Sequence, residues 1–558
     1  MKGFFSTFIR VSIRKHASIA TIAVMFSRFA GLLREMVFAF FFGAGPVLDA
    51  FIAAFRIPNL LRDLFSEGAL STSFITVFSK KCAKEGDKPA WELANQVMSY
   101  ILVVVGGLTV LGIIFSPLFV HLVASGFTGE KYTYTVFLTR FLFPFILFVS
   151  LAALCMGMLN TKGKFALPQS ASTFFNITSI TIGLIASYFF SPEWFHTVWH
   201  YGADASKGLV TWKMSTRAMT GMALGTMAGG LVQWLVQVPS LYRLGFRFRF
   251  GFSFKNKDFR NVLQLTLPAI LGGAAVQINV MINTNFASYL VDGSISWLNY
   301  AFRLMQFPIG VFGVAVATAT TPVLARMVAT KDTLHLQKTL GQSTQMALFL
   351  CLPSALGLIV LAEPIMALIY QRGHFNISDT LQSAHALQAY AVGLVAYALV
   401  KIYQPAFLAF NDAKTPMIIS LVSIAINFVL NWIFVFVLHW GHWGLALGTS
   451  AVALWNAFAL IKISSKNIPQ VWNKNLFKQL TKIFISSLIA AVFAWGTYFY
   501  LLHLMGNSRL IDRFVLTLAP IAMAVGIYVV TCLILGVEEA RAMTTWTSRK
   551  FKPSSKNE

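Results

Sequence analysis

Long apolar runs separated by short polar segments recur along the whole chain. Most runs have about 20 residues or more, the length that an α-helix needs to cross a hydrocarbon core about 30 Å thick. Backbone polar groups in lipid must be bonded within the chain, so we expect helices rather than the short alternating strands of a barrel. Fourteen spans are predicted, near residues 17–42, 50–79, 93–123, 133–159, 166–190, 216–242, 261–289, 296–325, 340–370, 383–410, 416–438, 442–463, 483–503 and 514–536.

Lysine and arginine are spread unevenly over the loops between these spans. With a cytoplasmic N-terminus, the cytoplasmic segments carry 30 of the 44 basic residues and the opposite loops carry 7. Positive charge collects on the cytoplasmic side of membrane proteins, so the pattern predicts both termini there. The basic first 16 residues continue into a full span without a small-residue cleavage site, and no removable signal peptide is expected.

A faint internal repeat divides the spans into two sets. One offset of 247 residues relates Ala54-Phe55-Arg56 to Ala301-Phe302-Arg303, Pro117 to Pro364, and Gly126 to Gly373. An offset shared by separate segments predicts two homologous six-helix lobes of the same orientation, with a cleft between them. We expect an N-lobe at 1–243 (spans 1–6), a C-lobe at 244–465 (spans 7–12), and a C-terminal part at 466–558 with the last two spans and a basic tail.

Composition narrows the class of protein. Hydrophobic residues make up 57% and charged residues 11% of the 558, whereas soluble domains carry about 25% charged residues. The net charge of +24 could indicate a nucleic-acid partner, but its placement in loops between apolar runs argues against one. The four cysteines have no CxxC spacing and are interpreted as reduced core residues, so no metal site is predicted. No phosphate-binding GxxxxGK[ST] loop is present, so no ATP hydrolysis by the chain itself is expected.

Seven basic residues lie inside spans or at their ends, namely Arg28, Arg34, Arg56, Arg62, Arg140, Arg303 and Lys401. An arginine at the centre of a membrane helix is unfavourable by roughly 2.5–3.5 kcal/mol unless it faces water or an anion. A hydrated cationic cavity would remove that penalty, and a planar guanidinium suits phosphate through paired N–H bonds. The alternative is structural ion pairing with Glu35, Asp49, Asp63 and Glu67. Arg303 has no acid at helical spacing, because its neighbours are Phe302 and Gln306.

Proline and glycine interrupt the helices that carry these arginines. Pro58, with nearby glycines at 31, 43, 45 and 68, allows the first two helices to bend or break, as occurs where backbone lines a cavity. Pro308, Gly310 and Gly313 predict a comparable bend after Arg303. Tight helix packing by small residues is the alternative explanation for each glycine.

Several motifs together resemble the MurJ/MviN family of lipid II flippases. They are Ser27-Arg28…Gly31…Arg34, Phe42-Gly43-Ala44-Gly45…Asp49-Ala50-Phe51, Pro58-Asn59-Leu60-Leu61-Arg62…Glu67-Gly68-Ala69, Ser296-Trp297, Arg303-Leu304-Met305, Phe307-Pro308…Gly310, Gly313-Val314-Ala315 and Lys414-Thr415-Pro416. The resemblance implies an all-α, fourteen-helix fold of the multidrug/oligosaccharidyl-lipid/polysaccharide exporter superfamily in the bacterial inner membrane. It also implies lipid II, an undecaprenyl-pyrophosphate disaccharide pentapeptide, as substrate, and contacts with the cell-wall synthesis machinery.

The same resemblance assigns roles to individual residues. It places substrate binding at Arg28, Arg34, Arg62 and Arg303, and an acidic cavity residue at Asp49. Further cavity and gating candidates are Glu35, Arg56, Asn59, Glu67, Ser296 and Gln306. The last two spans would form a groove for the lipid tail.

The chain also departs from the family pattern. Glu35 replaces the usual Asp, and Phe302 and Gln306 stand where many members have acids. Some members resemble sodium-coupled carriers, with acids and amides in spans 7, 11 and 12. Here those spans offer asparagines, so Asn283, Asn427 and Asn431 form a candidate cation site, with interhelical hydrogen bonding as the alternative. The 191–215 loop is long and holds Trp194, Trp199 and Trp212, which suggests an aromatic anchor at the outer interface.

These observations favour a transporter over an enzyme. The hypothesis is that the arginines clamp the pyrophosphate in an inward-open cleft and the lobes then rock outward. The membrane potential, H⁺ or Na⁺ would couple the cycle, and no cofactor is expected. The alternatives are an ion-coupled exporter of drugs or of other polyprenyl-linked oligosaccharides, a membrane glycosyltransferase or phosphatase, and a non-transporting scaffold. A cation exporter would need cavity acids, and an enzyme would need paired carboxylates, of which no DD or DxD motif is found.

Overall fold

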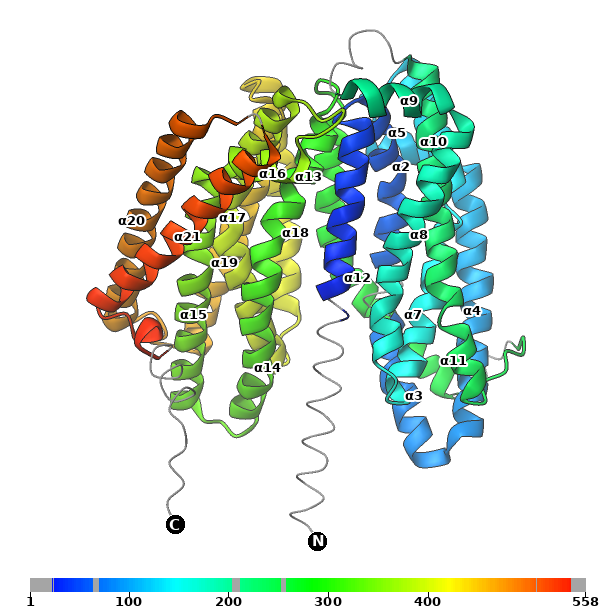
Figure 1. Ribbon diagram of the computed structural model, residues 1–558. Helices are drawn as coiled ribbons and strands as arrows, with labels where there is room; N and C mark the ends of the chain where they lie inside the picture. Colours follow the sequence, from blue (N-terminus) through cyan, green and yellow to red (C-terminus); the bar gives the residue numbers. More distant parts are fainter. Residues whose placement is uncertain are drawn as a thin grey trace, which may run out of the picture. The chain divides into compact units, whose positions relative to one another are not determined.

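In the computed structural model the chain is built of helices, and no strand occurs among the residues that the structure describes, which are 23, 25–63, 70–202, 211–251, 257–507 and 509–542 (Figure 1). The helices form two compact units. The first unit comprises residues 1–296 and 372–376, and the second comprises 297–371 and 377–558. We describe each unit by itself.

The first unit opens with a helix over residues 25–42. It continues through α2 (Pro46–Arg62), α3 (Leu70–Glu85), α4 (Asp87–Ile114), α5 (Ser116–Val123), α6 (Gly129–Leu142), α7 (Phe145–Thr161), α8 (Ala166–Phe190), α9 (Pro192–Tyr201), α10 (Trp212–Leu235), α11 (Val238–Arg243) and α12 (Lys257–Ala287). Its main core lies between α3, α4 and α7, around the fully buried rings of Phe74, Phe78 and Phe143. Helix α12 packs on α3 and therefore falls in this unit. The predicted lobe boundary at residue 243 was drawn from the internal sequence repeat, whereas the units described here are defined by packing. The boundary therefore stays a prediction.

The second unit is formed by the later helices. They are α13 (Ser294–Pro308), whose first turn still belongs to the first unit, η3 (Ile309–Gly313), α14 (Val314–Ala329), α15 (Thr333–Val360), α16 (Ala362–Tyr370), α17 (Ile377–Ala409), α18 (Lys414–Trp432), η4 (Ile433–Val437), α19 (Gly441–Asn467), α20 (Lys474–Met505) and α21 (Leu510–Ile534). Helices α20 and α21 lie side by side (Figure 1). The Tyr528 hydroxyl donates to the Phe349 carbonyl at 2.6 Å, which ties α21 to α15.

Eleven helices of the described residues are long and apolar enough to cross a membrane. They coincide with eleven of the predicted spans. The other three predicted spans, 17–42, 50–79 and 261–289, each include residues whose backbone or side chains lie outside the described part. Large apolar side chains are exposed on these helices, for example Ile534 at 76%, as expected where the surrounding medium is lipid.

Helix ends repeat with the offset that the sequence suggests. Helices α4 and α15 have 28 residues each, and each breaks into a short helix with proline in its first turn. These short helices, α5 and α16, end at Val123 and Tyr370, which are 247 residues apart. The sequence of breaks is therefore the same in both places.

The bend predicted after Arg303 is a π-helix. Segment η3 follows Pro308 directly, and the N–H of Val314 donates to the Ile309 carbonyl, five residues earlier. Proline has no N–H to donate to the turn before it, so the regular α ladder is interrupted at this point. Pro58 lies inside α2, which stays α-helical as far as Arg62.

Helices α8 and α10 approach closely because glycine lines their contact. Gly221, Gly225 and Gly229 are spaced by four residues on one face of α10. A Cβ on Gly225 would lie 2.4 Å from the Ser179 carbonyl oxygen and 2.5 Å from the Gly183 Cα. Small residues at this spacing let two membrane helices come into backbone contact.

We expect Gly225→Val to destabilise the first unit, because its side chain would collide with the α8 backbone. Overpacking typically lowers the free energy of unfolding by about 1–3 kcal/mol. Thermal unfolding of the purified chain in detergent should show a clear loss of stability. Gly496→Ala in α20 is the control, because nothing lies within 4 Å of its added Cβ. Equal melting temperatures for Gly225→Val and the unmodified chain would contradict this account of the helix pair.

Candidate functional site

Two of the candidate arginines in the first unit lie beside a neighbouring acid. Arg34 Nη2 donates to Glu35 Oε1 at 3.1 Å, and both side chains are only about one-eighth exposed. The Arg34 guanidinium also lies over the Phe175 ring of α8, 5.1 Å from its centroid. The adjacent acid and the aromatic ring offset part of the cost of burying this cation in an apolar helix.

The second pair, Arg62 with Asp63, lies at the C-terminal end of α2. Arg62 donates from Nε and Nη2 to Asp63 Oδ1 at 3.1 and 2.7 Å. The other Asp63 oxygen accepts from Gln277 Nε2 of α12 at 3.0 Å. Arg56 and Asn59 are half-buried one to two turns earlier on α2. Arg34 and Arg62 are thus ion-paired, as the alternative interpretation of the sequence expected. Both pairs remain partly open to solvent.

The remaining candidates are placed separately. Arg28 is exposed on the helix of residues 25–42, and Glu67 lies outside the described residues. In the second unit, Arg303 and Gln306 are exposed on α13, one turn apart and just before η3. Phe302 packs against Tyr390 of α17, with ring centroids 5.3 Å apart.

Asp49 is more deeply buried than Glu35, the other candidate acid that the structure describes. It lies in the first turn of α2 and is 1% exposed. Its Oδ1 accepts from the Ser296 N–H and hydroxyl at 2.9 and 2.7 Å. Its Oδ2 accepts from the Gly293 N–H at 2.7 Å and from Lys131 Nζ at 3.3 Å. A carboxylate in this position satisfies the free N–H groups at the start of α13 and favours the positive end of the helix dipole.

The structure therefore brings together Asp49 and Ser296, two residues singled out separately by the sequence. Sequence reasoning missed Lys131, which it counted only as one of the few basic residues in the outer loops. Lys131 also contacts Asp292 at 2.6 Å and covers the Phe127 ring at 4.0 Å. The feature of the sequence that could have singled out Lys131 is that basic residues are scarce in the loops predicted to lie opposite the cytoplasm.

A related link in the second unit was also missed. Trp297 Nε1 donates to Asp379 Oδ1 at 3.0 Å, and both side chains are buried. Lys131 and Asp49 are 82 residues apart, as are Trp297 and Asp379. One link joins α2 to α6, and the other joins α13 to α17. In each predicted half, the first of these helices is the second helix of the half, and the other follows the glycine of the repeat, Gly126 or Gly373. The two links differ by 248 residues, one more than the offset of the repeat, so they are similar in placement but do not join equivalent positions.

The paired glycines of the repeat make matching contacts within the first unit. A Cβ on Gly126 would lie 2.5 Å from the Ser288 carbonyl oxygen, just after α12. A Cβ on Gly373, which has φ +58°, would lie 2.3 Å from the Phe40 carbonyl oxygen, and the next N–H, that of His374, donates to that oxygen at 2.8 Å. Each glycine thus packs against the end of the first helix of the other predicted half. Only glycine combines such a backbone angle with so close an approach.

The asparagines of the candidate cation site do not all lie in one unit. Asn283 is half-buried on α12 of the first unit, whereas Asn427 and Asn431 are buried on α18 of the second. No group of three or more His, Cys, Asp or Glu that could hold a metal occurs among the described residues. The cation site stays a prediction.

The tryptophans of the 191–215 loop differ in their surroundings. Trp194 of α9 is 1% exposed and stacks on Phe42, with ring centroids 4.6 Å apart. Trp199 is 62% exposed. Trp194 therefore packs α9 onto the helix of residues 25–42 and is not an interface anchor, a role that remains open to Trp199.

Solved structures of similar fold show the class of protein to which the chain's fold belongs. The fold matches an inward-facing multidrug resistance MATE transporter of the MOP superfamily with a TM-score of 0.63 and 16% identity, over 82% of this chain and 98% of that one. A solved structure of lipid II flippase MurJ in an inward closed conformation matches with a TM-score of 0.72 and 27% identity, over 92% and 98%. The chain has the fold of MOP-superfamily transporters.

The particular family follows from the sequence comparisons. The family model "Lipid II flippase MurJ" matches residues 38–519. The probable lipid II flippase MurJ of Buchnera aphidicola is 32% identical over 489 residues, 87% of this chain and 89% of that protein. The lipid II flippase MurJ of Burkholderia cenocepacia is 33% identical over 442 residues, 78% and 80% of the two chains. The chain belongs to the MurJ lipid II flippase family.

Asp49 and Asp292 share Lys131 and provide a matched pair of substitutions. We expect Asp49→Asn to lower the free energy of unfolding by about 3 kcal/mol or more, because it breaks a buried charge pair and turns an amide N–H₂ towards donors. Asp292, whose side chain is 60% exposed, should contribute about 1 kcal/mol or less when changed to Asn. Chemical unfolding in detergent measures both. Equal losses would show that burial does not decide the strength of this cluster.

Proposed function

We propose that this chain is a lipid II flippase, a transporter that carries undecaprenyl-pyrophosphate-linked disaccharide pentapeptide from the cytoplasmic to the outer leaflet of a bacterial inner membrane. The observation that carries the proposal is the family match over residues 38–519. The proposed topology has fourteen spans, both termini in the cytoplasm, and two pseudo-symmetric lobes followed by two helices that hold the lipid tail. Contacts with the cell-wall synthesis machinery are part of the proposal.

The substrate-binding residues in this proposal are Arg28, Arg34, Arg62 and Arg303. Ion pairs change the charge that these residues present. Glu35 and Asp63 neutralise Arg34 and Arg62, so the four arginines and two acids together carry a net charge of +2. Each phosphate of a diphosphate bridge carries a negative charge, so the bound pyrophosphate and the site are close to balance.

This balance supports coupling to the membrane potential. A loaded carrier with little net charge responds weakly to voltage, whereas an empty cationic carrier is drawn towards a negative interior. Each charge that crosses the full potential changes the free energy by about 2.3 kcal/mol per 100 mV. The potential would therefore return the empty carrier inward without ATP.

Arg28→Ala and Arg303→Ala should each reduce lipid II transport by about ten- to hundredfold, because each removes a charge-assisted bond worth about 1.5–3 kcal/mol. Appearance of the headgroup outside proteoliposomes, with the lipid recovered chemically unchanged, measures transport. Arg217→Ala, on an exposed face of α10, is the control and should retain full activity. Full activity of both test variants would indicate a scaffold, and transport of cationic dyes in place of lipid II would indicate a drug exporter.

Dissipating the membrane potential should slow headgroup appearance, whereas collapsing only the proton gradient should not. Valinomycin with equal potassium on both sides of proteoliposomes removes the potential, and nigericin removes the pH difference without moving net charge. We expect the first treatment alone to inhibit transport. Inhibition by nigericin alone would replace voltage with proton coupling, and dependence on sodium would return attention to Asn283, Asn427 and Asn431.

A further inference from the structure

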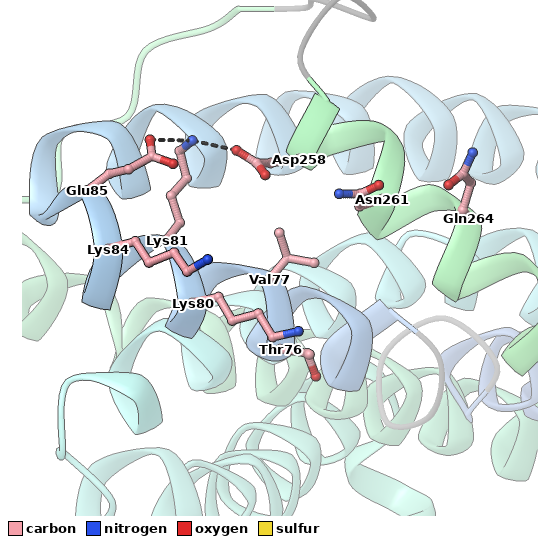
Figure 2. A pocket seen from close by; sticks show the side chains of 9 residues that line it. All are labelled: Thr76, Val77, Lys80, Lys81, Lys84, Glu85, Asp258, Asn261 and Gln264. Atoms are coloured by element: carbon pink, nitrogen blue, oxygen red, sulfur yellow. Dashed lines mark hydrogen bonds and ion pairs between the residues drawn. The ribbon is translucent and has the colours of Figure 1, made fainter.

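A cavity lies between α3 and α12 of the first unit, apart from the arginines discussed above. Its volume is about 380 Å³, within the range of small-ligand sites. It is lined by Thr76, Val77, Lys80, Lys81, Lys84, Glu85, Asp258, Asn261 and Gln264. Figure 2 shows lysines extending from α3 on one side and the amides of Asn261 and Gln264 on α12.

The three lysines of the cavity are in different situations. Lys81 is paired with Glu85 and Asp258, and the hydrogen bond with Asp258 raises the pKa of Lys81 (Figure 2). Lys80 and Lys84 are exposed, and neither has an ion pair with any described residue. They are four residues apart on one face of α3, so their ammonium groups repel one another unless an anion lies between them.

The donors around these two lysines suit an oxyanion. Thr76 lies one turn before Lys80 on the same face of α3 and also lines the cavity. Asn261 and Gln264 add amide N–H₂ donors from the facing helix. Three lysines and two acids leave the cavity with a net charge of +1. A singly charged phosphate diester matches this charge and these donors.

The position of the cavity along the chain indicates where that anion comes from. Lys80 follows the predicted span 50–79 directly, and Asn261 begins the predicted span 261–289. In the topology of the proposed function, both positions lie at the cytoplasmic surface of the membrane. Basic pockets between helices at that surface bind the headgroups of anionic lipids.

We propose that the cavity between α3 and α12 is a binding site for the phosphate of an anionic glycerophospholipid in the cytoplasmic leaflet, held by Lys80 and Lys84. The inference rests on the proposed function only for its topology. The site is separate from the arginines assigned to the substrate, and its occupant is a lipid that is bound and not transported.

The test uses the full-length purified chain and phosphatidylglycerol as the probe. Phosphatidylglycerol is titrated into the detergent-solubilised protein, and bound lipid is counted by native mass spectrometry. The double variant Lys80→Gln/Lys84→Gln should bind the tightest phosphatidylglycerol about thirtyfold more weakly, since each lysine near a membrane surface contributes about a factor of five. The control is Lys474→Gln/Lys478→Gln, an exposed pair with the same spacing on α20 that should leave binding unchanged.

A variant that is expected to bind more tightly distinguishes an effect on the site from a folding defect, because a misfolded chain would not gain affinity. Glu85→Gln raises the cavity charge by one and leaves Lys81 its bond with Asp258, so phosphatidylglycerol should bind more tightly. Equal affinity for the unmodified chain and both lysine variants would overturn the proposal. Full displacement by inorganic phosphate at equal concentration would assign the site to a free anion, and loss of lipid II binding in Lys80→Gln/Lys84→Gln would assign it to the substrate; either result overturns it.

The outcome is independent of transport. Lysine variants that lose phosphatidylglycerol while Arg28→Ala still blocks flipping would support both proposals. Phosphatidylglycerol binding at this cavity in a chain that transports nothing would support the lipid site and reject the flippase function. The two failures are thus separable.

Discussion

A charged side chain within an apolar bundle is stable only beside an opposite charge, a set of hydrogen-bond partners or water, and this constraint organises the polar chemistry of the molecule. Asp49 meets it with three donors from the start of α13 and the ammonium of Lys131. Arg34 and Arg62 meet it with adjacent acids. The Asp49 cluster is therefore also a place where chain segments distant in sequence are held together.

The internal repeat predicted from the sequence has a counterpart in the order of the helices. In each predicted half a helix of 28 residues is followed by a short helix with proline in its first turn, and each half has a polar link over 82 residues whose chemistry differs. In one half the carboxylate is on α2 and the partner is a lysine, and in the other it is on α17 and the partner is an indole. These links are one residue out of register with the offset of 247, so they are alike in placement and not equivalent in sequence.

Much of the fold could be predicted because lipid imposes a simple rule on sequence. Apolar length located eleven spans that the structure also has, and Pro308 indicated the irregular segment after Arg303. The short spacing from Arg34 to Glu35 made an ion pair foreseeable. The sequence singled out Asp49 and Ser296 separately but could not predict their contact. Nothing near Ser296 or Lys131 in the sequence reveals which distant carboxylate they contact. Trp194 was misplaced for a similar reason, because aromatic residues suit a membrane interface and a protein core equally well.

The π-helical segment η3 has a consequence for how α13 and α14 move. Each regular residue of an α-helix advances the chain by about 100°, and a π turn holds one residue more than an α turn. Tightening η3 into regular helix would therefore change the rotational phase of α13 relative to α14 by about that amount, without unwinding either one. Arg303, nearly two turns before the segment, would thus swing to another face while α14 kept its packing against α15 and α17.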